Sequence, residues 1–546
     1  MIQKLVFTLL TIMVLGACDR DRSTADLIIR NGVIYTADSG FTIYTAMAMQ
    51  NGKILDVGDD KFILENYSSD SIIDLLGKAV YPGFIDAHCH FYGYADMQRF
   101  ADLTKAASFN TMLEIVQEHH NLHPDLWIVG RGWDQNKWPS RVFPHNQELN
   151  KLFPDNPVVL VRVDGHAVLV NEAAIVLSGL TPDSISDKKM AVMENGKFTG
   201  VFLESYADFF RNLVPAPEGD HLTELLLKAA ADCHQTGLTM VADAGLDAKV
   251  IDHIDELQSA KKLKMALYAM LNPTEDNINR FMKRGILVKP KLSIRSIKFY
   301  ADGALGSRGA CLIDPYSDQP ENHGILTISA DELGRYCVMA YDYGYQINTH
   351  AIGDSAVRMV LDVYSNYLLP DNDLRWRIEH AQVVHPDDFK KFGEFRIVPS
   401  IQATHATSDM RWAGTRLGNE RLKNAYAYRK LMLQNGWIPN GTDFPIEGIS
   451  PIETFYSTIS RKDHHGYPPN GFQKENALTR EEALRSVTIW AAKSCFEENR
   501  RGSLEPGKNA DFVILDRDIM VISEREIPLA KVMRTYIDGE AVYIQN

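Results

Sequence analysis

The sequence predicts an α/β protein: a (β/α)8 TIM-type barrel with a long insertion after strand 1, plus a β-sandwich built from both chain ends. Three observations support this fold class. Eight short apolar runs alternate with helical stretches, which is typical of barrels of parallel strands. About 150 residues separate the first two runs, far more than an ordinary crossover needs. Short β-rich segments with turn signals flank the series on both sides.

The composition excludes several classes of protein. The chain has 546 residues, of which 45% are hydrophobic and 23% are charged, as in soluble globular proteins. Lys and Arg number 57 against 71 Asp and Glu, which gives a net charge of −14. Nucleic acid is therefore not an expected partner, because phosphate contacts need clustered cations. Six cysteines in a chain of this length do not form a disulfide scaffold.

The amino terminus predicts a lipoprotein signal peptide over residues 1–17. Lys4 precedes an apolar run at residues 5–14, and the next residues are Leu15-Gly16-Ala17-Cys18. This pattern resembles the bacterial lipobox, in which the peptide is cut before a cysteine that is then lipidated. The alternatives are an ordinary secretory peptide and a buried apolar segment.

The lipobox resemblance also implies a location. Residues 18–25 would form a polar tether, and the chain would be anchored through Cys18 to a membrane of a bacterial cell envelope, facing the periplasm. Asp19 favours the inner membrane.

The two ends of the mature chain are predicted to form the β-sandwich. Residues 26–80 and 496–546 contain short β-rich runs, with hairpin turn signals at Asn31-Gly32, Asn51-Gly52 and Asp538-Gly539.

The barrel is expected over residues 81–495. Its eight predicted strands lie at residues 79–88, 238–245, 265–270, 296–303, 345–352, 376–382, 396–403 and 437–445. Residues 221–237 and 355–368 are predicted helices between them. The insertion, about residues 91–225, is interpreted as a cap over the barrel mouth, with an independent domain as the alternative.

Polar residues interrupt the apolar strands near their carboxyl ends. His88 and His90 are two residues apart, so their imidazoles should share one face of a strand and could bind a divalent ion. Lys298, His350, His380 and Asp443 occupy similar positions in later strands. Burying these groups without partners would be costly, and a shared metal site gives all of them partners.

The same residues carry a family resemblance. The phrases PGFIDAHCHF, IKFYADGALGSRGA, INTHAIGDSAV, RIEHAQ and GTDFP, in this order, resemble the amidohydrolase superfamily. They are most similar to its amidohydrolase family 3 branch, which includes N-substituted formamide deformylase. The resemblance covers residues 26–546.

The resemblance implies a ligand set. His88 and His90 would bind one ion, and His350 and His380 a second if there are two. Lys298 would bridge the ions as an N6-carboxylysine, or stay unmodified and contact substrate or Asp302. Asp443 would bind metal and carry protons as the catalytic residue. We expect Zn²⁺, one or two ions, although imidazole also accepts Fe²⁺ and Mn²⁺.

The chemistry expected of this site is hydrolysis of a non-peptide carbon–nitrogen bond in a small amide or N-substituted formamide. A bound Zn²⁺ lowers the pKa of its water from about 16 to about 7, and Asp443 would move the proton to the leaving nitrogen. Alternatives on the same site are a deaminase, an isomerase or an ester or lactone hydrolase. A non-catalytic ligand-binding lipoprotein is a further alternative. The oligomeric state stays open, a homodimer included.

Four other residues are candidates for substrate binding. His166 lies in the insertion, Asp302 and Arg308 follow the Lys298 strand, and His405 follows the seventh strand. For His166 the alternative is a half-exposed turn residue, and for Asp302 and Arg308 a structural ion pair. Glu204 is a candidate ligand or a solvated carboxylate, and Trp133 and Trp138 form an aromatic wall or pack inside the insertion.

Overall fold

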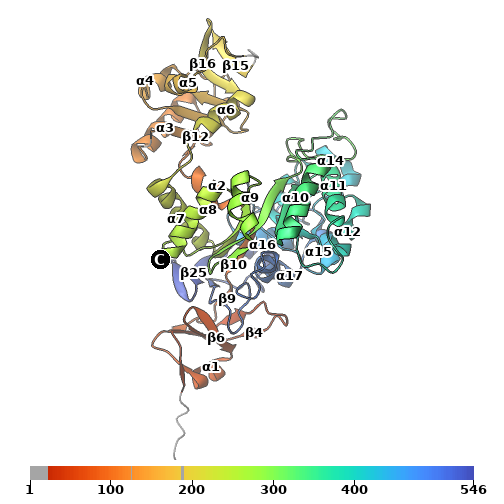
Figure 1. The fold of residues 1–546 in the computed structure, drawn as a ribbon. Coiled ribbons are helices and arrows are strands. Elements are labelled where there is room, and N and C mark those ends of the chain that lie inside the picture. The colour runs from red at the N-terminus through yellow and green to blue at the C-terminus, as the bar shows by residue number, and fades with distance from the viewer. Residues whose placement is uncertain (1–21, 125, 186–189, 546) are drawn as a thin grey trace, which may run out of the picture.

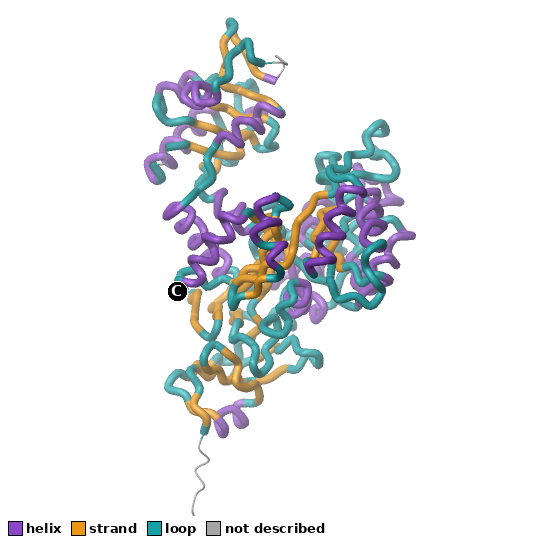
Figure 2. The backbone as a smooth tube through the Cα atoms, in the orientation of Figure 1, coloured by secondary structure: helices purple, strands orange, loops and turns teal. Residues whose placement is uncertain are grey.

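Seven parallel strands form the centre of the molecule. The structure, a computed structural model, describes residues 22–124, 126–185 and 190–545; the predicted signal peptide, with Cys18 and Asp19, lies outside them. The strands are hydrogen-bonded in chain order. Figure 2 shows strands at the centre of the molecule with helices around them. They are β10 (Phe84–Cys89), β17 (Leu238–Leu246), β18 (Ala266–Leu271), β20 (Leu292–Tyr300), β21 (Gln346–Ala351), β22 (Arg377–His380) and β23 (Val398–Ser400). The predicted fold class is confirmed.

The eighth segment closes the barrel without forming a strand. The backbone N–H of Ala87 donates to Asn440 O (3.3 Å), and that of Gly441 donates to Ile401 O (2.9 Å). The N–H of Asp443 donates to the carbonyl of His88 over 2.8 Å. The segment thus bridges β23 and β10, but prolines at 439 and 445 and the positive φ of Asp443 (62°) interrupt a regular ladder. The strand predicted at 437–445 is therefore only partly correct.

Helices cover the outside of the barrel between successive strands (Figure 1). They are α7 (Gly219–Gln235), α8 (Ala248–Ser259), α9 (Glu275–Arg280), α10 (Ala330–Tyr343), α11 (Asp354–Ser365), α12 (Phe389–Glu394) and α15 (Tyr428–Asn435). Helix α10 shows how the sequence sets its ends. The Ser329 hydroxyl accepts from the N–H of Glu332, and Gly344 ends the helix in the left-handed region.

The sandwich combines both chain ends, as predicted. One sheet has the order β6-β5-β2-β8 and the other β26-β25-β24-β9-β3-β4. Strand β24 (Phe512–Leu515) pairs antiparallel with β9 (Ala79–Pro82), which joins the two ends. The remaining strands are β2 (Leu27–Arg30), β3 (Val33–Tyr35), β4 (Ile43–Tyr44), β5 (Ala46–Gln50), β6 (Lys53–Gly58), β8 (Ile72–Asp74), β25 (Val532–Ile537) and β26 (Glu540–Ile544).

Two of the three predicted hairpin turns are confirmed and one is wrong. Asn51-Gly52 joins β5 to its antiparallel partner β6, and Asp538-Gly539 joins β25 to β26. Asn31-Gly32 lies between β2 and β3, which belong to different sheets. That turn carries the chain from one layer of the sandwich to the other, because β3 pairs instead with β4 and β9.

The insertion forms a lobe of its own (Figure 1). It follows α2 (Phe91–Met97), which packs against α7 on the barrel. Its sheet has the order β11-β12-β13-β14-β16-β15, flanked by helices and stabilised by two separate hydrophobic clusters. The elements are β11 (Ala101–Asp102), α3 (Phe109–Leu122), β12 (Ile128–Trp133), α4 (Gln147–Leu152), β13 (Val158–Arg162), β14 (Ala167–Val170), α5 (Glu172–Ser178), β15 (Ala191–Glu194), β16 (Lys197–Leu203) and α6 (Ser205–Leu213). These separate clusters agree with the alternative of an independent domain, and the cap stays a prediction.

Within the described ranges, no helix has both the length and the apolar character needed to span a bilayer.

Candidate metal centre

Four histidines from three strands meet at the carboxyl ends of the barrel strands. His88 and His90 come from the end of β10, with ring centroids 5.7 Å apart. The ring of His380, at the end of β22, lies 5.0 Å from His88 and 4.5 Å from His350, which is on β21. Residues separated by almost 300 positions in the chain therefore face one another, as the predicted metal site requires.

Asp443 completes the first group of candidate ligands. Its Oδ1 lies 3.3 Å from His90 Nε2 and 3.5 Å from His88 Nε2. This oxygen is buried and has no hydrogen-bond partner among the described residues. The ligand atoms of His88, His90 and Asp443 lie within 4.8 Å of one another, so the three side chains could hold a metal ion. A buried carboxylate oxygen without a hydrogen-bond donor is energetically costly, and a cation bound beside it would remove that cost.

A second group shares Asp443. Its Oδ2 lies 3.1 Å from His405 Nε2, and the ligand atoms of His380, His405 and Asp443 also lie within 4.8 Å of one another. His405 is therefore a candidate ligand in this group, whereas the sequence predicted that it binds substrate. His350, predicted as a ligand beside His380, is close to it, and its Nε2 is buried without a hydrogen-bond partner among the described residues.

Two of these ligands have unusual backbone conformations. His380 has φ 72° and Asp443 has φ 62°, in the left-handed region that non-glycine residues seldom adopt. Such conformations cost about 1–3 kcal/mol each and persist where the surroundings enforce them. Here they turn the end of β22 and the segment that closes the barrel so that both side chains face the centre.

Burial keeps His88, His350 and His380 neutral, which is the form that binds metal. Burial, followed by the positive charge of Lys298, lowers the pKa of His88 to about 4 and that of His350 to about 3. Burial also holds the pKa of His380 well below its usual range. For Asp443, burial alone would raise the pKa, but the hydrogen bond with His405 and the nearby imidazoles of His90, His88 and His380 outweigh it and keep the pKa low.

Lys298 lies in the same cluster, from β20. Its Nζ is 3.4 Å from His88 Nε2, and the side chain is fully buried. Burial lowers the pKa of Lys298 to about 8, although the nearby carboxylates Glu379 and Asp443 oppose the change. A substantial fraction of the amine is therefore neutral near physiological pH, which is the form that reacts with CO₂.

Glu379 is a functional residue that the sequence reasoning missed. Its Oε2 accepts from His88 Nδ1 over 2.5 Å, and its Oε1 pairs with Arg377 Nε over 2.7 Å. All three side chains are fully buried. Binding of Nδ1–H by the carboxylate leaves His88 Nε2 free as a metal ligand. The segment RIEHAQ did indicate this ion pair, because Arg377 and Glu379 are two residues apart in a buried strand and therefore share one face.

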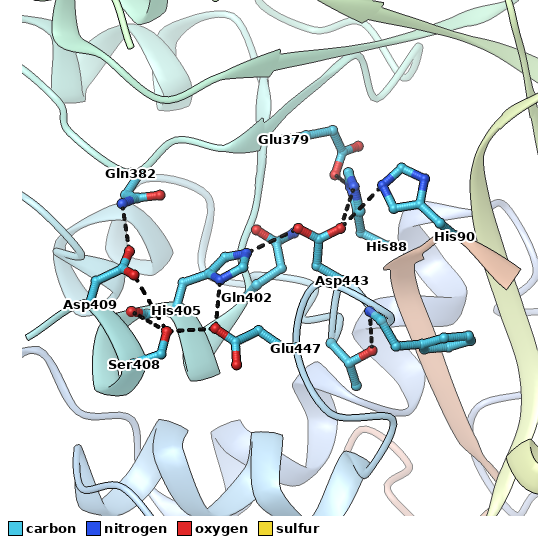
Figure 3. A network of polar contacts seen from close by, with 12 residues as sticks. His88, His90, Glu379, Gln382, Gln402, His405, Ser408, Asp409, Asp443 and Glu447 are labelled. Atoms are coloured by element: carbon cyan, nitrogen blue, oxygen red, sulfur yellow. Dashed lines mark hydrogen bonds and ion pairs between the residues drawn. The ribbon is translucent and has the colours of Figure 1, made fainter. Parts of the chain in front are cut away.

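A polar network extends from Asp443 through His405, on the side away from His88 and His90 (Figure 3). His405 Nδ1 lies 3.1 Å from Glu447 Oε1, and the Ser408 hydroxyl donates to the same oxygen over 2.5 Å. Burial would lower the pKa of His405, but hydrogen bonds to Asp443 and Glu447 raise it to about 10. His405 is therefore a cation between two carboxylates in the metal-free protein.

The cluster opens into a cavity of about 370 Å³. Apolar and aromatic side chains line one part of it, and the acids Asp409 and Glu447 another. Its lining includes Tyr300, Leu305, Ile352, Trp412 and Ile446. The volume suits a small-molecule substrate.

The other predicted substrate residues do not line this cavity. Arg308 is paired with Asp318 over 2.8 Å. Asp302 is buried and accepts backbone N–H bonds from Ile352, Gly353 and Cys311, so it shapes the loop beside His350. Arg308 agrees with the alternative of a structural ion pair, although its partner is Asp318, whereas Asp302 is held by backbone N–H groups.

The insertion residues also lie away from the cavity. His166 is exposed and pairs with Glu204 over 3.0 Å, so a role for either in binding substrate stays a prediction. Trp133 and Trp138 are buried, and their indole N–H groups donate to backbone carbonyls, so they pack inside the insertion. No described residue of the insertion lines the cavity.

Comparison with known proteins agrees with this geometry. The model of the amidohydrolase family matches residues 71–543. The chain is 30% identical to protein LONG AFTER FAR-RED 3 of Arabidopsis thaliana, over 95% of this chain and 92% of that protein. It is 27% identical to the N-substituted formamide deformylase of Arthrobacter pascens, over 95% and 98%. An uncharacterized metal-dependent hydrolase of Pyrococcus horikoshii OT3 superposes with a TM-score of 0.79 at 28% identity, over 91% of this chain and 99% of that structure.

Proposed function

This chain belongs to the amidohydrolase family, a group of metal-dependent enzymes that act on small molecules, and we propose that it hydrolyses the carbon–nitrogen bond of an amide or N-substituted formamide. The observation that carries the proposal is the orphaned Oδ1 of Asp443, which faces His88 and His90 at the edge of the cavity. The relative from Arthrobacter pascens, a formamide deformylase by name, supports this choice of bond.

The metal that we propose is Zn²⁺, held by His88, His90, His380 and Asp443, with His350, or His405 after loss of its proton, as a further ligand. Neutral imidazoles and a carboxylate are donors that Zn²⁺ accepts. When bound, the ion supplies a hydroxide at neutral pH and a positive charge beside the scissile carbonyl. We further propose that Lys298 carries a carboxyl group, because its amine points into the same cluster and an unmodified lysine cation cannot bind metal.

The chain's own residues would handle the proton. Asp443 has one oxygen toward the histidines and the other held by His405, so it can take a proton at the site of attack and deliver it to the leaving nitrogen. Glu447 fixes the ring of His405 from its far side. Glu379 fixes the ring of His88.

The cavity favours a substrate without a carboxylate. Arg308 and Arg416 are both paired with Asp318 and neither lines the cavity, whereas Asp409 and Glu447 do. An anionic substrate would meet two carboxylates and no uncommitted arginine among the described lining residues. We therefore propose an uncharged or cationic amide with an apolar or aromatic body, which would pack against Trp412.

The test uses the full chain loaded with Zn²⁺. We expect hydrolysis of N-formylphenethylamine and slower hydrolysis of N-formylphenylalanine, which differs by one carboxylate. Asp443→Asn should lower kcat about 100-fold or more, because general acid–base groups contribute this much. Asp371→Asn, an exposed control, should have no effect. A metal-loaded protein that is inert on a panel of N-formyl and N-acyl amines would refute the proposal.

For the location, we propose a lipid anchor on Cys18 at a bacterial membrane. The proposal rests on the pattern of residues 1–18, with its cationic start, short apolar run and small residues before the cysteine. Expression in a bacterium should place the protein in the membrane fraction, and Cys18→Ser should prevent lipidation and cleavage. Detection of the unlipidated, fully processed protein in wild-type cells would contradict the anchor.

A further inference from the structure

A second cavity lies where the insertion meets the barrel. Its volume is about 370 Å³, within the range of small-ligand sites. Asp96 lines it from the end of α2, Arg99 and Phe100 line it from the connection that follows, and Val214 and Ala216 line it from the return connection after α6. Strands β12 and β13 contribute its floor. The cavity therefore touches both segments that join the two lobes, and it shares no lining residue with the metal centre.

Three arginines converge on this cavity, and their charge is only partly neutralised. Arg99 pairs through Nε with Asp96 over 2.7 Å, and Arg211 pairs with Asp208 one helical turn away. Arg131 is exposed, and within the described part of the chain its guanidinium has no hydrogen-bond or ion-pair partner. The three guanidinium cations thus have only two carboxylate partners among the described residues, those of Asp96 and Asp208.

The arginines also influence one another. Burial, followed by the positive charge of Arg131, lowers the pKa of Arg211. The two guanidinium groups therefore repel each other in the absence of an anion. A bound anion between them would remove this repulsion and supply Arg131 with an acceptor.

Apart from Asp96 and Asn212, the rest of the lining is apolar. Val129 and Val159 are buried strand residues, and Val161 and Val214 lie beside them. Inorganic ions such as phosphate would leave this surface without a partner. An organic anion with a short hydrocarbon body would bury it and place its charged group at the arginines.

We propose that this cavity binds a small amphiphilic organic anion, a carboxylate or sulfonate with a short aliphatic or aromatic body. The charged group would contact Arg131 and Arg211, and the body would lie on the valines of β12 and β13. Because the site is separate from the metal centre, the proposal does not depend on the reaction that the centre catalyses. The ligand would contact both connections between the barrel and the insertion.

The experiment measures binding of octanoate to the full chain by calorimetry, with octan-1-ol as the uncharged comparison. We expect octanoate to bind and octan-1-ol to bind at least about tenfold more weakly, since charge-assisted hydrogen bonds are lost. Arg131→Gln should weaken octanoate binding by about tenfold or more. Arg211→Gln, the second variant, should weaken it as well.

The controls separate this cavity from other sites. Arg335→Gln replaces an exposed arginine on α10 and should leave octanoate binding unchanged. Arg131→Gln should unfold at the wild-type temperature, because its side chain is exposed and unpaired. Hydrogen exchange with octanoate should slow at residues 96–100 and 212–216. Unchanged affinity in both Arg131→Gln and Arg211→Gln, equal loss in Arg335→Gln, or binding of octan-1-ol as tight as that of octanoate would overturn the proposal.

Discussion

Replacing Glu379 by Gln should weaken both the metal centre and the fold. Glu379 accepts from His88 Nδ1 over 2.5 Å and pairs with Arg377 over 2.7 Å, and all three side chains are fully buried. Burial would raise the pKa of Glu379, but the charge of Arg377 and the hydrogen bond from His88 hold it well below its usual range. The carboxylate is therefore ionised at neutral and mildly acidic pH, and a neutral amide changes the site.

The magnitude follows from these partners. Removing one member of a buried ion pair costs about 3–5 kcal/mol, because the other charge stays buried without compensation. Arg377 keeps other acceptors, among them the Ala87 carbonyl and the Ser400 hydroxyl, so we expect about 3 kcal/mol. Loss of the carboxylate that orients a metal-binding histidine lowers metal affinity about 10- to 100-fold.

Two measurements check this prediction. Urea unfolding of the metal-free protein gives the change in stability, and competition with a chromophoric chelator gives the affinity for Zn²⁺. Glu420→Gln is the matched control, since Glu420 is 85% exposed and pairs with Lys423 on the surface. Its effect on stability should be below about 1 kcal/mol, with no change in metal binding. If Glu379→Gln binds Zn²⁺ as tightly as the wild-type protein, His88 is not oriented in the way that the geometry indicates.

Three further predictions concern the same centre. In metal-free protein, the pKa of His88 is about 4 when folded and near 6.5 when unfolded, so the unfolded chain takes up more protons between these values. Stability should therefore fall on acidification from about pH 6.5, by about 3 kcal/mol for this residue at pH 4, and a flat urea-unfolding profile over this range would contradict the burial argument. Lys298, with a pKa of about 8, is about half neutral at pH 8, against about 0.3% for an ordinary lysine. Carbon-13 bicarbonate should thus give a carbamate NMR signal that is absent in Lys298→Met; the same signal in both proteins would assign it to another amine. Gly441→Ala should destabilise the protein by about 1–3 kcal/mol and reduce metal binding, because the new Cβ would lie 2.5 Å from the backbone nitrogen of His88. Gly414→Ala, whose Cβ would make an ordinary contact at 3.5 Å, is its control, and equal thermal unfolding temperatures for the two variants would refute this packing argument.

Local patterns in the sequence predicted the elements and the chemistry of the barrel. The period of the apolar residues determines which segments become strands or helices, so seven of the eight predicted barrel strands were found as strands. The eighth was not, because prolines and a left-handed aspartate prevent a regular ladder while still allowing closure of the barrel. His88, His90, Lys298, His350, His380 and Asp443 were recognisable because polar groups at the ends of buried strands need partners.

Pairings between distant side chains could not be predicted in this way. Arg308 was expected at the substrate, but its guanidinium is held by Asp318. Glu379 was overlooked although it contacts His88, 291 positions earlier in the chain. Asn31-Gly32 has the composition of a hairpin turn, yet the strands on either side belong to different sheets. In each case the outcome depends on which groups the fold brings together.

The sequence by itself determined the barrel, the sandwich and the set of groups able to bind a divalent ion, because these depend on local periodicity and on the cost of burying polar atoms. The tertiary structure alone decided which carboxylate orients His88, that His405 shares Asp443 with the histidines, and that three arginines meet beside the insertion. These contacts are set by distances of a few ångströms between residues far apart in the chain, and such distances exist only once the chain has folded.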